Sequence, residues 1–350
     1  MSDEFYINRC LDLAALASGN VSPNPMVGCV IVADGKIIGE GYHQEYGKAH
    51  AEPNAIKAVF DTYGHGAENL LKQATAYVNL EPCAHFGKTP PCADLLVKHK
   101  LKKVVIGARD PFSGVDGKGI EKLKNAGIEV VSGILDDKCR YFNRRFFTRI
   151  QKQRPYIILK WAETANGYFA TKDGHQKWIS GALAKRLAHQ WRSEEDAILI
   201  GKQTAVMDNP QLTSREWPGK NPIRLVIDKN LQVPLSNHLF NAEAKTIIFN
   251  EKKTDVVDNI HYIQMVDMHF YLAQKIAFQL YLMDIQSVII EGGANILNQF
   301  LNTSLWDEAR IFTSSTSWGD GVSAPNINGN LQETLQIGND KLSVYLNDIK

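Results

Sequence analysis

Two hydrophobic patterns alternate along residues 1–150 of the chain. Continuous apolar runs at 27–32 and 36–41 flank Asp34-Gly35, which predicts two strands joined by a tight turn. Segments with helical spacing of apolar residues begin at residues 52 and 92, so helices are expected there. Further strands are predicted at 76–80, 104–108 and 128–131. Strands interleaved with helices predict an α/β layer.

The second half repeats this alternation after Pro155, where regular structure is expected to restart. Short β-branched runs predict strands at 156–161, 197–200, 223–227, 246–249, 287–290, 309–312 and 342–346. Helical spacing covers 181–192 and 270–283. The basic stretch 140–154 between the halves is interpreted as a solvated helix face and linker. Two α/β domains are therefore expected, at 1–148 and 149–350.

Composition narrows the class of protein. Hydrophobic residues make up 44% of the 350 residues and charged residues 22%, which is ordinary for a soluble globular protein. The formal net charge of +1 argues against a polyanionic partner such as tRNA. No apolar run approaches the length of a membrane span, and the N-terminus lacks a signal-peptide pattern. With only five cysteines, a reducing, cytoplasmic location is expected.

A candidate metal site lies within the first hundred residues. His50, Cys83 and Cys92 offer one imidazole and two thiolates, which leaves a tetrahedral Zn²⁺ ion one open position for water. Glu52 is two positions from His50 and is free to move protons between that water and a substrate. A His-x-Glu motif followed by Pro-Cys and a second cysteine is the signature of zinc-dependent nucleobase deaminases.

A closed, structural zinc site is the alternative at this position. His85, two residues after Cys83, could supply a fourth ligand and leave no position for water. Glu52 beside His50 favours the open, catalytic site. The remaining cysteines are interpreted as small buried thiols outside the site: Cys10, Cys29 and Cys139.

A second candidate site lies at 288–297, where an apolar run leads into Gly292-Gly293 and then into an apolar helix. Backbone N–H groups at such a helix start can bind a phosphate, and the helix dipole favours the anion. Tight packing of strand against helix is the alternative explanation of the two glycines. The six-position dinucleotide fingerprint is absent from the sequence, so an ordinary Rossmann domain is disfavoured.

Taken together, these motifs resemble the bifunctional deaminase-reductase family of bacterial riboflavin biosynthesis, over nearly the whole chain. The first half matches at Asn24-Pro25-Met26-Val27-Gly28, His50-Ala51-Glu52 and Glu81-Pro82-Cys83-Ala84-His85-Phe86-Gly87-Lys88-Thr89-Pro90-Pro91-Cys92. The second half matches at Lys177-Trp178-Ile179-Ser180, Asp208-Asn209-Pro210-Gln211-Leu212-Thr213 and Glu291-Gly292-Gly293. The long loop between the two cysteines is specific, because tRNA and cytidine deaminases usually have two residues there.

The resemblance implies a cytidine-deaminase-like α/β/α domain followed by a dihydrofolate-reductase-like α/β domain. The first would bind Zn²⁺ and deaminate diaminohydroxyphosphoribosylaminopyrimidine by hydrolysis. The second would use NADPH to reduce the ribosyl group to ribityl, giving 5-amino-6-(5-phosphoribitylamino)uracil. The implied partner is this small phosphoribosylated pyrimidine, with no nucleic acid and no membrane, and the enzyme is expected to be a homo-oligomer.

The same resemblance assigns residues to these activities. His50, Cys83 and Cys92 would hold zinc, and Glu52 would move protons. Positions that match cofactor contacts are Ala162, Trp178, Thr204, Asp208, Gly293, Ala294 and Asn295. Positions that match substrate contacts are Asn24, Gln176, Arg192, Leu212, Arg215 and Glu291.

Residue chemistry supports these assignments unevenly. Arg192 and Arg215 suit a phosphate because guanidinium groups bind its oxygens bidentately, although surface ion pairs are the alternative. Asp208 is also explained by a turn or helix cap, and Trp178 by core packing. Lys160, on the first strand of the second half, is a hypothetical proton donor to the opened sugar.

One departure from the family bears on reductase activity. Where the family usually has Asp-Gly-Lys, this chain has Asn166-Gly167-Tyr168, which keeps a turn but loses two charges. A second hypothesis is therefore a deaminase of another nucleobase whose C-terminal half binds a nucleotide without reducing anything. Near-neutral charge and the long cysteine loop argue against a tRNA deaminase.

Overall fold

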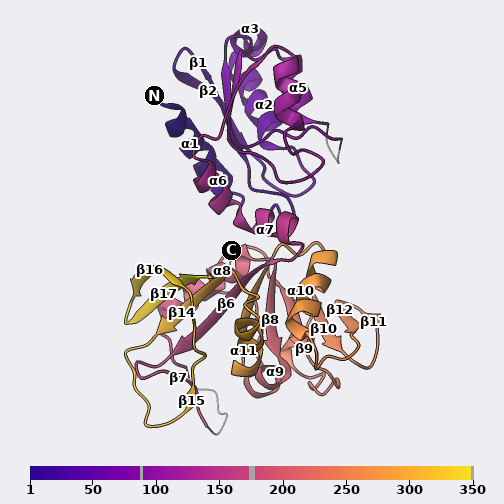
Figure 1. Ribbon diagram of the computed structural model, residues 1–350, viewed down its shortest axis with the longest axis vertical. Helices are drawn as coiled ribbons and strands as arrows, with labels where there is room; N and C mark the ends of the chain where they lie inside the picture. The colour runs from indigo at the N-terminus through magenta and orange to yellow at the C-terminus, as the bar shows by residue number, and fades with distance from the viewer. Residues whose placement is uncertain (87–89, 173–177, 348–350) are drawn as a thin grey trace. The chain divides into compact units, whose positions relative to one another are not determined.

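The computed structural model describes residues 1–86, 90–172 and 178–347, which form two compact units, Met1–Gln153 and Arg154–Lys350 (Figure 1). Each unit contains a β-sheet with helices packed against it. Within the described ranges, no helix is both long and apolar enough to span a membrane.

The first unit is built on a five-stranded sheet in the order β2-β1-β3-β4-β5. The β1–β2 and β1–β3 pairs are antiparallel, whereas β3, β4 and β5 are parallel. The strands are β1 (Gly28–Ala33), β2 (Lys36–Tyr42), β3 (Thr75–Leu80), β4 (Lys103–Ala108) and β5 (Glu129–Ser132). The helices are α1 (Asp3–Ala15), α2 (Ala51–Tyr63), α3 (Ala67–Leu71), α4 (Cys92–Lys98), α5 (Lys118–Asn125), α6 (Asp136–Phe142) and α7 (Arg144–Lys152), and the short 3-10 turn η1 is Gly64–Gly66.

Helices cover both faces of this sheet because side chains alternate along its strands. On β1, Cys29 and Ile31 pack into one core with residues of α2, α3, α4 and α5. Val30 and Val32 point to the other face and pack with residues of α1, α6 and α7. A strand buried on both faces accounts for the continuous apolar run in the sequence. The unit is therefore an α/β/α sandwich.

The second unit is built on a ten-stranded sheet in the order β11-β12-β10-β9-β8-β13-β6-β14-β17-β16. Its parallel centre runs from β12 to β14, and β11, β16 and β17 pair antiparallel at the two edges. The strands of this unit are β6 (Tyr156–Glu163), β7 (Tyr168–Ala170), β8 (Ala197–Gly201), β9 (Ile223–Ile227), β10 (Thr246–Asn250), β11 (Asp255–Val257), β12 (Ile260–Gln264), β13 (Ser287–Gly292), β14 (Glu308–Thr313), β15 (Val322–Ser323), β16 (Asn330–Ile337) and β17 (Asp340–Leu346). Of these, β7 and β15 form a separate two-stranded antiparallel sheet. The helices are α8 (Ala182–Glu194), α9 (Lys202–Asp208), α10 (Leu272–Leu282) and α11 (Ala294–Asn302), with a 3-10 turn, η2 (His238–Phe240).

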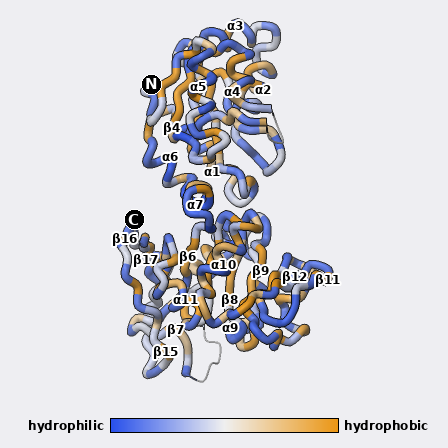
Figure 2. The backbone as a smooth tube through the Cα atoms, turned by 45° about the vertical axis from the view of Figure 1, so that its right-hand side comes forward, coloured by the Kyte–Doolittle hydropathy of each residue, from blue (hydrophilic) through white to orange (hydrophobic). Residues whose placement is uncertain are grey.

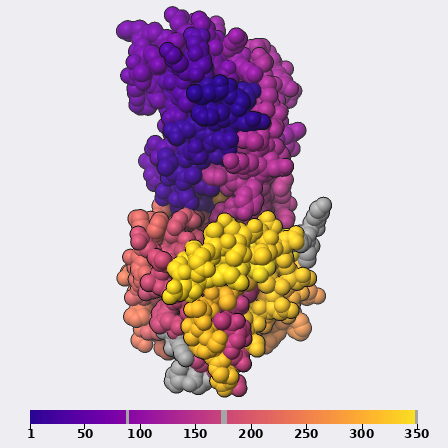
Figure 3. Space-filling view, turned by 90° about the vertical axis from the view of Figure 1, so that its left-hand side faces the viewer, coloured from indigo at the N-terminus to yellow at the C-terminus, as the bar shows by residue number. Residues whose placement is uncertain are grey.

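Alternation again divides the core of the second unit. On β6, Ile157 and Leu159 pack with residues of α10 and α11, whereas Ile158 packs with residues of α8 and α9. The central strand β8 is apolar over almost its whole length and is coloured as hydrophobic in Figure 2. The late strands, yellow in Figure 3, form a continuous surface on one face of this unit, where β16 is the exposed edge.

All strands and helices predicted from the hydrophobic pattern are present, with ends displaced by a few residues at most. The helix expected within 140–154 is present as α6 and α7, but the interpretation of this segment as a linker is wrong, because both helices belong to the first compact unit. Phe146 and Phe147 on α7 are buried in its core. The prediction missed α1, which packs against β1 and β3. The predicted domain boundary at 148/149 falls inside α7. The division of the two activities at this boundary stays a prediction.

Candidate active sites

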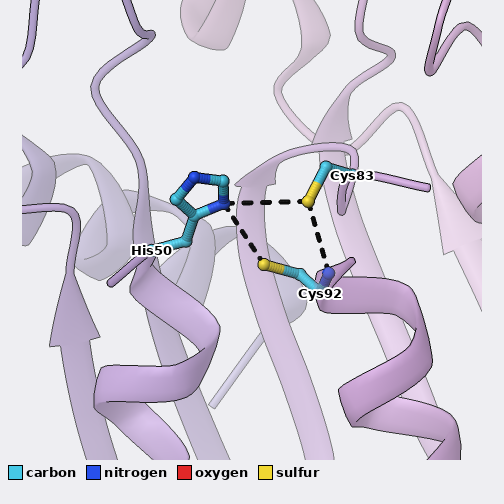
Figure 4. A group of neighbouring side chains, drawn as sticks. All are labelled: His50, Cys83 and Cys92. Atoms are coloured by element: carbon cyan, nitrogen blue, oxygen red, sulfur yellow. Dashed lines mark hydrogen bonds between the residues drawn. The ribbon is translucent and has the colours of Figure 1, made fainter. Parts of the chain in front are cut away.

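Three elements of the first unit bring the predicted metal ligands together (Figure 4). His50 is the N-cap residue of α2, Cys92 is the first residue of α4, and Cys83 follows β3 through Pro82. The Nδ1 atom of His50 lies 3.7 Å from Cys83 Sγ and 3.3 Å from Cys92 Sγ. All three ligand atoms lie within 4.8 Å of one another.

This donor set fits a zinc ion. A tetrahedral ion with ordinary Zn–N and Zn–S bond lengths would separate its nitrogen and sulfur ligands by about 3.6 Å. The Cys92 N–H also donates a hydrogen bond to Cys83 Sγ over 3.2 Å. Hydrogen bonding with Cys92 and with His50 outweighs burial and lowers the pKa of Cys83, which favours its thiolate. A thiolate is the form that binds metal.

The closed four-ligand alternative is not supported. Among the described residues, the cluster that could hold a metal consists of His50, Cys83 and Cys92 and does not include His85. The His85 ring instead lies 5.4 Å from the ring of Phe112. Glu52 is only 3% exposed, and burial, reinforced by the charge of Cys83, raises its pKa. A carboxyl whose pKa is raised, beside an open metal position, is suited to proton transfer.

A cavity of roughly 310 Å³ opens in front of these residues. Its lining includes Asn24, His43, Tyr46, Lys48, His50, Glu52, Cys83, His85, Asp110, Phe112, Phe146, Arg149 and Ile150. Burial and the charge of Glu81 raise the pKa of Asp110 to about 7. The sequence signalled Asn24 and the ligands, but gave no motif for the wall contributed by α7. This wall consists of Phe146, Arg149 and Ile150, which lie in the basic stretch of the sequence.

The amide of Asn24 has a defined orientation. His43 Nδ1 lies 3.0 Å from the carbonyl oxygen of Ala49, so this nitrogen carries the proton and donates it. His43 Nε2 is then an acceptor for the Asn24 Nδ2 donor at 3.1 Å. Burial lowers the pKa of His43, which keeps the ring neutral. Asn24 Oδ1 is thereby left as the atom that can accept a hydrogen bond from a ring N–H.

The second candidate site lies where three neighbouring parallel strands end. β8, β13 and β6 are adjacent in the sheet, and ligands bind outside the carboxyl ends of such strands. Glu291 on β13 accepts hydrogen bonds from Arg192 Nε at 3.2 Å and Nη2 at 2.7 Å. Lys160 on β6 lies 4.0 Å from the same carboxylate. Arg192 is therefore part of a buried charge cluster and not the surface ion pair that was the alternative.

The cations of this cluster dominate its electrostatics. Burial alone would raise the pKa of Glu291, but Arg192 and Lys160 lower it to about 2. Burial lowers the pKa of Lys160. His189, which is buried one turn before Arg192 on α8, belongs to no motif that the sequence analysis could recognise. Burial, with the charges of Arg192 and Arg215, lowers the pKa of His189 to about 4, so the ring is neutral at pH 7.

Four of the predicted cofactor positions lie at the Gly-Gly turn: Thr204, Gly293, Ala294 and Asn295. The Gly293 N–H donates to Thr204 Oγ1 over 3.0 Å, and a side chain on Gly292 would meet Thr204 at 3.3 Å. Ala294 and Asn295 open α11 directly after this turn. Ala162 lies near the carboxyl end of β6. Burial raises the pKa of Asp208, the last residue of α9.

The remaining predicted positions that the structure describes in the second unit lie outside the Gly-Gly turn and the Glu291 cluster. Trp178 is 67% exposed, which excludes the core-packing alternative, and Lys185 lies over its ring at 5.5 Å. Leu212 is buried with φ of 54°, a left-handed conformation that is strained for leucine, and Arg215 is exposed. Gln176 lies outside the described residues, as does the loop 87–89 that marks the family.

The departure at Asn166 has a structural explanation. Its Oδ1 accepts hydrogen bonds from Thr164 Oγ1 at 2.8 Å and from Trp318 N–H at 3.1 Å. Its Nδ2 donates to the Trp318 carbonyl at 2.6 Å. An aspartate could not make this donation, so the amide matches its surroundings. The lost charge is replaced by a specific contact between two loops.

Comparisons with known proteins identify both halves. The family model of the RibD C-terminal domain matches residues 155–350, and that of the cytidine and deoxycytidylate deaminase zinc-binding region matches residues 1–108. The riboflavin biosynthesis protein RibD of Aquifex aeolicus is 38% identical over 345 residues, covering 97% of this chain and 95% of the relative. RibD of Actinobacillus pleuropneumoniae is also 38% identical, covering 97% and 88%.

Solved structures agree with these matches. The crystal structure of a diaminohydroxyphosphoribosylaminopyrimidine deaminase/5-amino-6-(5-phosphoribosylamino)uracil reductase from Thermotoga maritima has a TM-score of 0.89 and 33% identity, and covers 99% of this chain and 98% of that one. Acinetobacter baumannii RibD gives 0.89 and 32%, with 98% of each chain covered. The predicted fold class, a deaminase α/β/α domain followed by a reductase α/β domain, is confirmed. This chain belongs to the RibD family of riboflavin biosynthesis proteins.

Proposed function

We propose that this chain is a bifunctional enzyme of riboflavin biosynthesis, with a hydrolytic deaminase in residues 1–148 and a reductase in residues 149–350. The substrate of the first step is diaminohydroxyphosphoribosylaminopyrimidine, and the second step reduces its ribosyl group to ribityl. The product is 5-amino-6-(5-phosphoribitylamino)uracil. The observation that supports the deaminase most directly is the His50–Cys83–Cys92 cluster at the edge of the cavity, with Glu52 beside it.

In the deaminase, His50, Cys83 and Cys92 would hold zinc, whose chemistry is to activate water as a nucleophile near neutral pH. Glu52 takes a proton from the attacking water and passes it to the ring nitrogen. It then moves the remaining proton of that oxygen to the amine, which leaves as ammonia while the water oxygen becomes the new carbonyl. Asn24 accepts a hydrogen bond from the pyrimidine edge through Oδ1, because its bond from Nδ2 to His43 fixes the orientation of the amide. The low exposure of Glu52 keeps bulk water from competing for its proton.

In the reductase, the bound nicotinamide would supply the hydride to the sugar carbon. The cofactor is surrounded by Thr204, Asp208, Ala162, Trp178 and the 293–295 turn. The substrate is contacted by Arg192, Leu212, Arg215, Glu291 and Gln176. Glu291 orients Arg192 through a bidentate pair, and Lys160, at the same carboxylate, donates a proton to the oxygen of the opened sugar. NADPH is the cofactor proposed, since the family resemblance implies it.

The second hypothesis, a deaminase of another base with an inactive nucleotide-binding module, is not favoured. The RibD C-terminal domain match covers the whole second unit from residue 155. Asn166 makes contacts that suit an amide, so its presence is no sign of decay. Homo-oligomer formation, a cytoplasmic location and the absence of a nucleic-acid partner stay predictions.

The test is mass-resolved product analysis with the phosphoribosylaminopyrimidine substrate, zinc-loaded enzyme, and NADPH, NADH or no nucleotide. Deaminated ribosyl product without nucleotide, and ribityl product with NADPH, are expected. Equal rates with NADH would contradict the cofactor assignment. Deamination without any reduction would refute the reductase, and no conversion at all would refute both activities.

A further inference from the structure

The loop that carries Asn24 depends on a residue far away in the sequence. Residues 24–27 precede β1 and lie outside the strands, although the Val27 carbonyl accepts a hydrogen bond from the His43 N–H at 2.9 Å. Asn143 lies 117 residues later, between α6 and α7, and is only 3% exposed. Its Oδ1 accepts a hydrogen bond from the Met26 N–H at 2.8 Å, and its Nδ2 donates to the Met26 carbonyl at 2.9 Å.

A second buried amide completes this clamp. Asn79 on β3 donates to the same Met26 carbonyl at 3.1 Å and accepts from the Gly28 N–H at 2.8 Å. Both polar groups of the Met26 backbone are therefore held by side chains, where a sheet would ordinarily supply a neighbouring strand. Asn79 sits inside the sheet, so Asn143 is the part of the clamp that ties the loop to the helical layer.

A purely local role does not explain Asn143. It occupies the N-cap position of α7, where asparagine usually bonds to the first turn of the helix, but its side chain makes no capping hydrogen bond. The amide reaches across to Met26 instead. Three residues of the helix that follows, Phe146, Arg149 and Ile150, line the same cavity as Asn24.

We infer that Asn143 is a positioning residue of the deaminase: it fixes the backbone of Met26 and so sets where the Asn24 amide meets the pyrimidine. Asn143 is neither a residue of the cavity lining nor a member of the metal-ligand cluster. The inference rests on the proposed deaminase function and extends the working part of this half beyond residue 108, where the match to the zinc-binding region ends. Loss of the clamp would release Met26 N–H and let Asn24 move relative to the metal ligands.

The experiment compares Asn143→Ala and Asn143→Leu with the wild type in the full-length, zinc-loaded enzyme. Leucine keeps most of the volume but removes both hydrogen bonds, so it separates the clamp from simple packing. Leu71→Ala is the matched control, because Leu71 is fully buried on α3 in the opposite core. Measurements are deaminase KM and kcat without NADPH, reductase rate on the deaminated substrate, zinc content, and hydrogen exchange of residues 22–28.

Both Asn143 variants are expected to lose on the order of 10–100-fold in deaminase kcat/KM, mainly through KM, since an ångström of misplacement has effects of this size. Exchange in 22–28 should speed up, with zinc content and reductase rate unchanged. Leu71→Ala should destabilise the unit yet keep KM within about twofold. An unchanged KM and exchange in Asn143→Leu, or an equal rise of KM in Leu71→Ala, would overturn the inference.

These readouts keep the inference separate from the proposed function. If the wild type does not deaminate the substrate, the proposed function fails, but hydrogen exchange still tests the clamp. If the wild type is active and both Asn143 variants match it in exchange and KM, only the positioning role fails.

Discussion

Replacing Glu291 by glutamine removes the one anion of a buried cluster that also holds Arg192 and Lys160. The exposed fractions of these side chains are 11%, 12% and 16%, so water screens the charges poorly. The carboxylate receives two hydrogen bonds from the Arg192 guanidinium and lies 4.0 Å from Lys160. The variant leaves both cations without their partner, which is the costly way to break a buried pair.

The pKa of Glu291 gives the magnitude. Arg192 and Lys160 overcome the effect of burial and lower the pKa from 4.5 to about 2. Such a decrease corresponds to about 3 kcal/mol of folding free energy, at the lower end of the 3–5 kcal/mol measured when buried pairs are broken. Because the folded pKa is depressed, this stabilisation is complete above pH 4.5 and is lost as the pH falls toward 2.

Tryptophan fluorescence isolates the unfolding of the second unit. All six tryptophans lie between residues 161 and 318, so the signal contains no contribution from tryptophan in the first unit. In urea unfolding at pH 7, Glu291→Gln should lose about 3 kcal/mol relative to the wild type. The difference should narrow only below pH 4.5. Deaminase activity, which belongs to the other unit, should be unchanged.

The control is Glu333→Gln, which removes the same charge from the exposed strand β16 and should change stability by no more than about 0.5 kcal/mol. A loss below about 1 kcal/mol in Glu291→Gln would show that the cluster contributes little net stability. A difference from the wild type that is equally large at pH 3 and pH 7 would refute its assignment to the Glu291 carboxylate.

Three further outcomes are expected. Glu52→Gln should lower the deaminase kcat by about 10²–10⁴-fold while zinc content and reductase rate stay at wild-type values; retention of activity would remove Glu52 from proton transfer. Asn166→Asp should lose about 1 kcal/mol in the tryptophan-detected transition without raising reductase rate, since the donation to the Trp318 carbonyl is lost; a faster reductase would show that the missing charge matters. The pKa of His189 is about 4 in the folded state and 6.5 in a free histidine, so the wild type should be about 1 kcal/mol less stable at pH 5.5 than at pH 8. His189→Gln should abolish this loss of stability at acid pH, and an equal loss in the variant would contradict the reasoning.

The parts of the molecule that the sequence predicted share one property: their signal is local. Strands buried on both faces appear as continuous apolar runs, as in β1 and β8. The metal ligands are predictable because each lies at the start of a helix or just after a strand, and because few residue types bind zinc. Glu52 follows from its spacing relative to His50, since residue 52 lies in the first turn of the helix that His50 caps.

Pairing across the sheet could not be predicted in the same way. Arg192 and Glu291 are 99 residues apart, and only the family resemblance placed them in one site. Nothing in the sequence shows that β8, β13 and β6 are neighbours, because strand order depends on how the crossover helices pack. Once that order is known, the register of β13 with β6, in which Ile290 pairs with Leu159, places Glu291 beside Lys160.

The basic segment 140–154 shows how a charge pattern can conceal a structural element. Its arginines suggested a solvated helix face and linker, yet Phe146 and Phe147 are buried and their rings meet edge to face at 6.0 Å. Adjacent aromatic residues do not form a stripe along a helix, so periodicity gives no warning of burial. Asn143 stands at the start of this helix, where an asparagine is typical of an ordinary N-cap. Its side chain instead bonds to the backbone of Met26, 117 residues earlier in the sequence. Side chains that serve the backbone of a distant loop therefore leave little trace in a sequence, and the pocket wall and its anchor had to come from the structure.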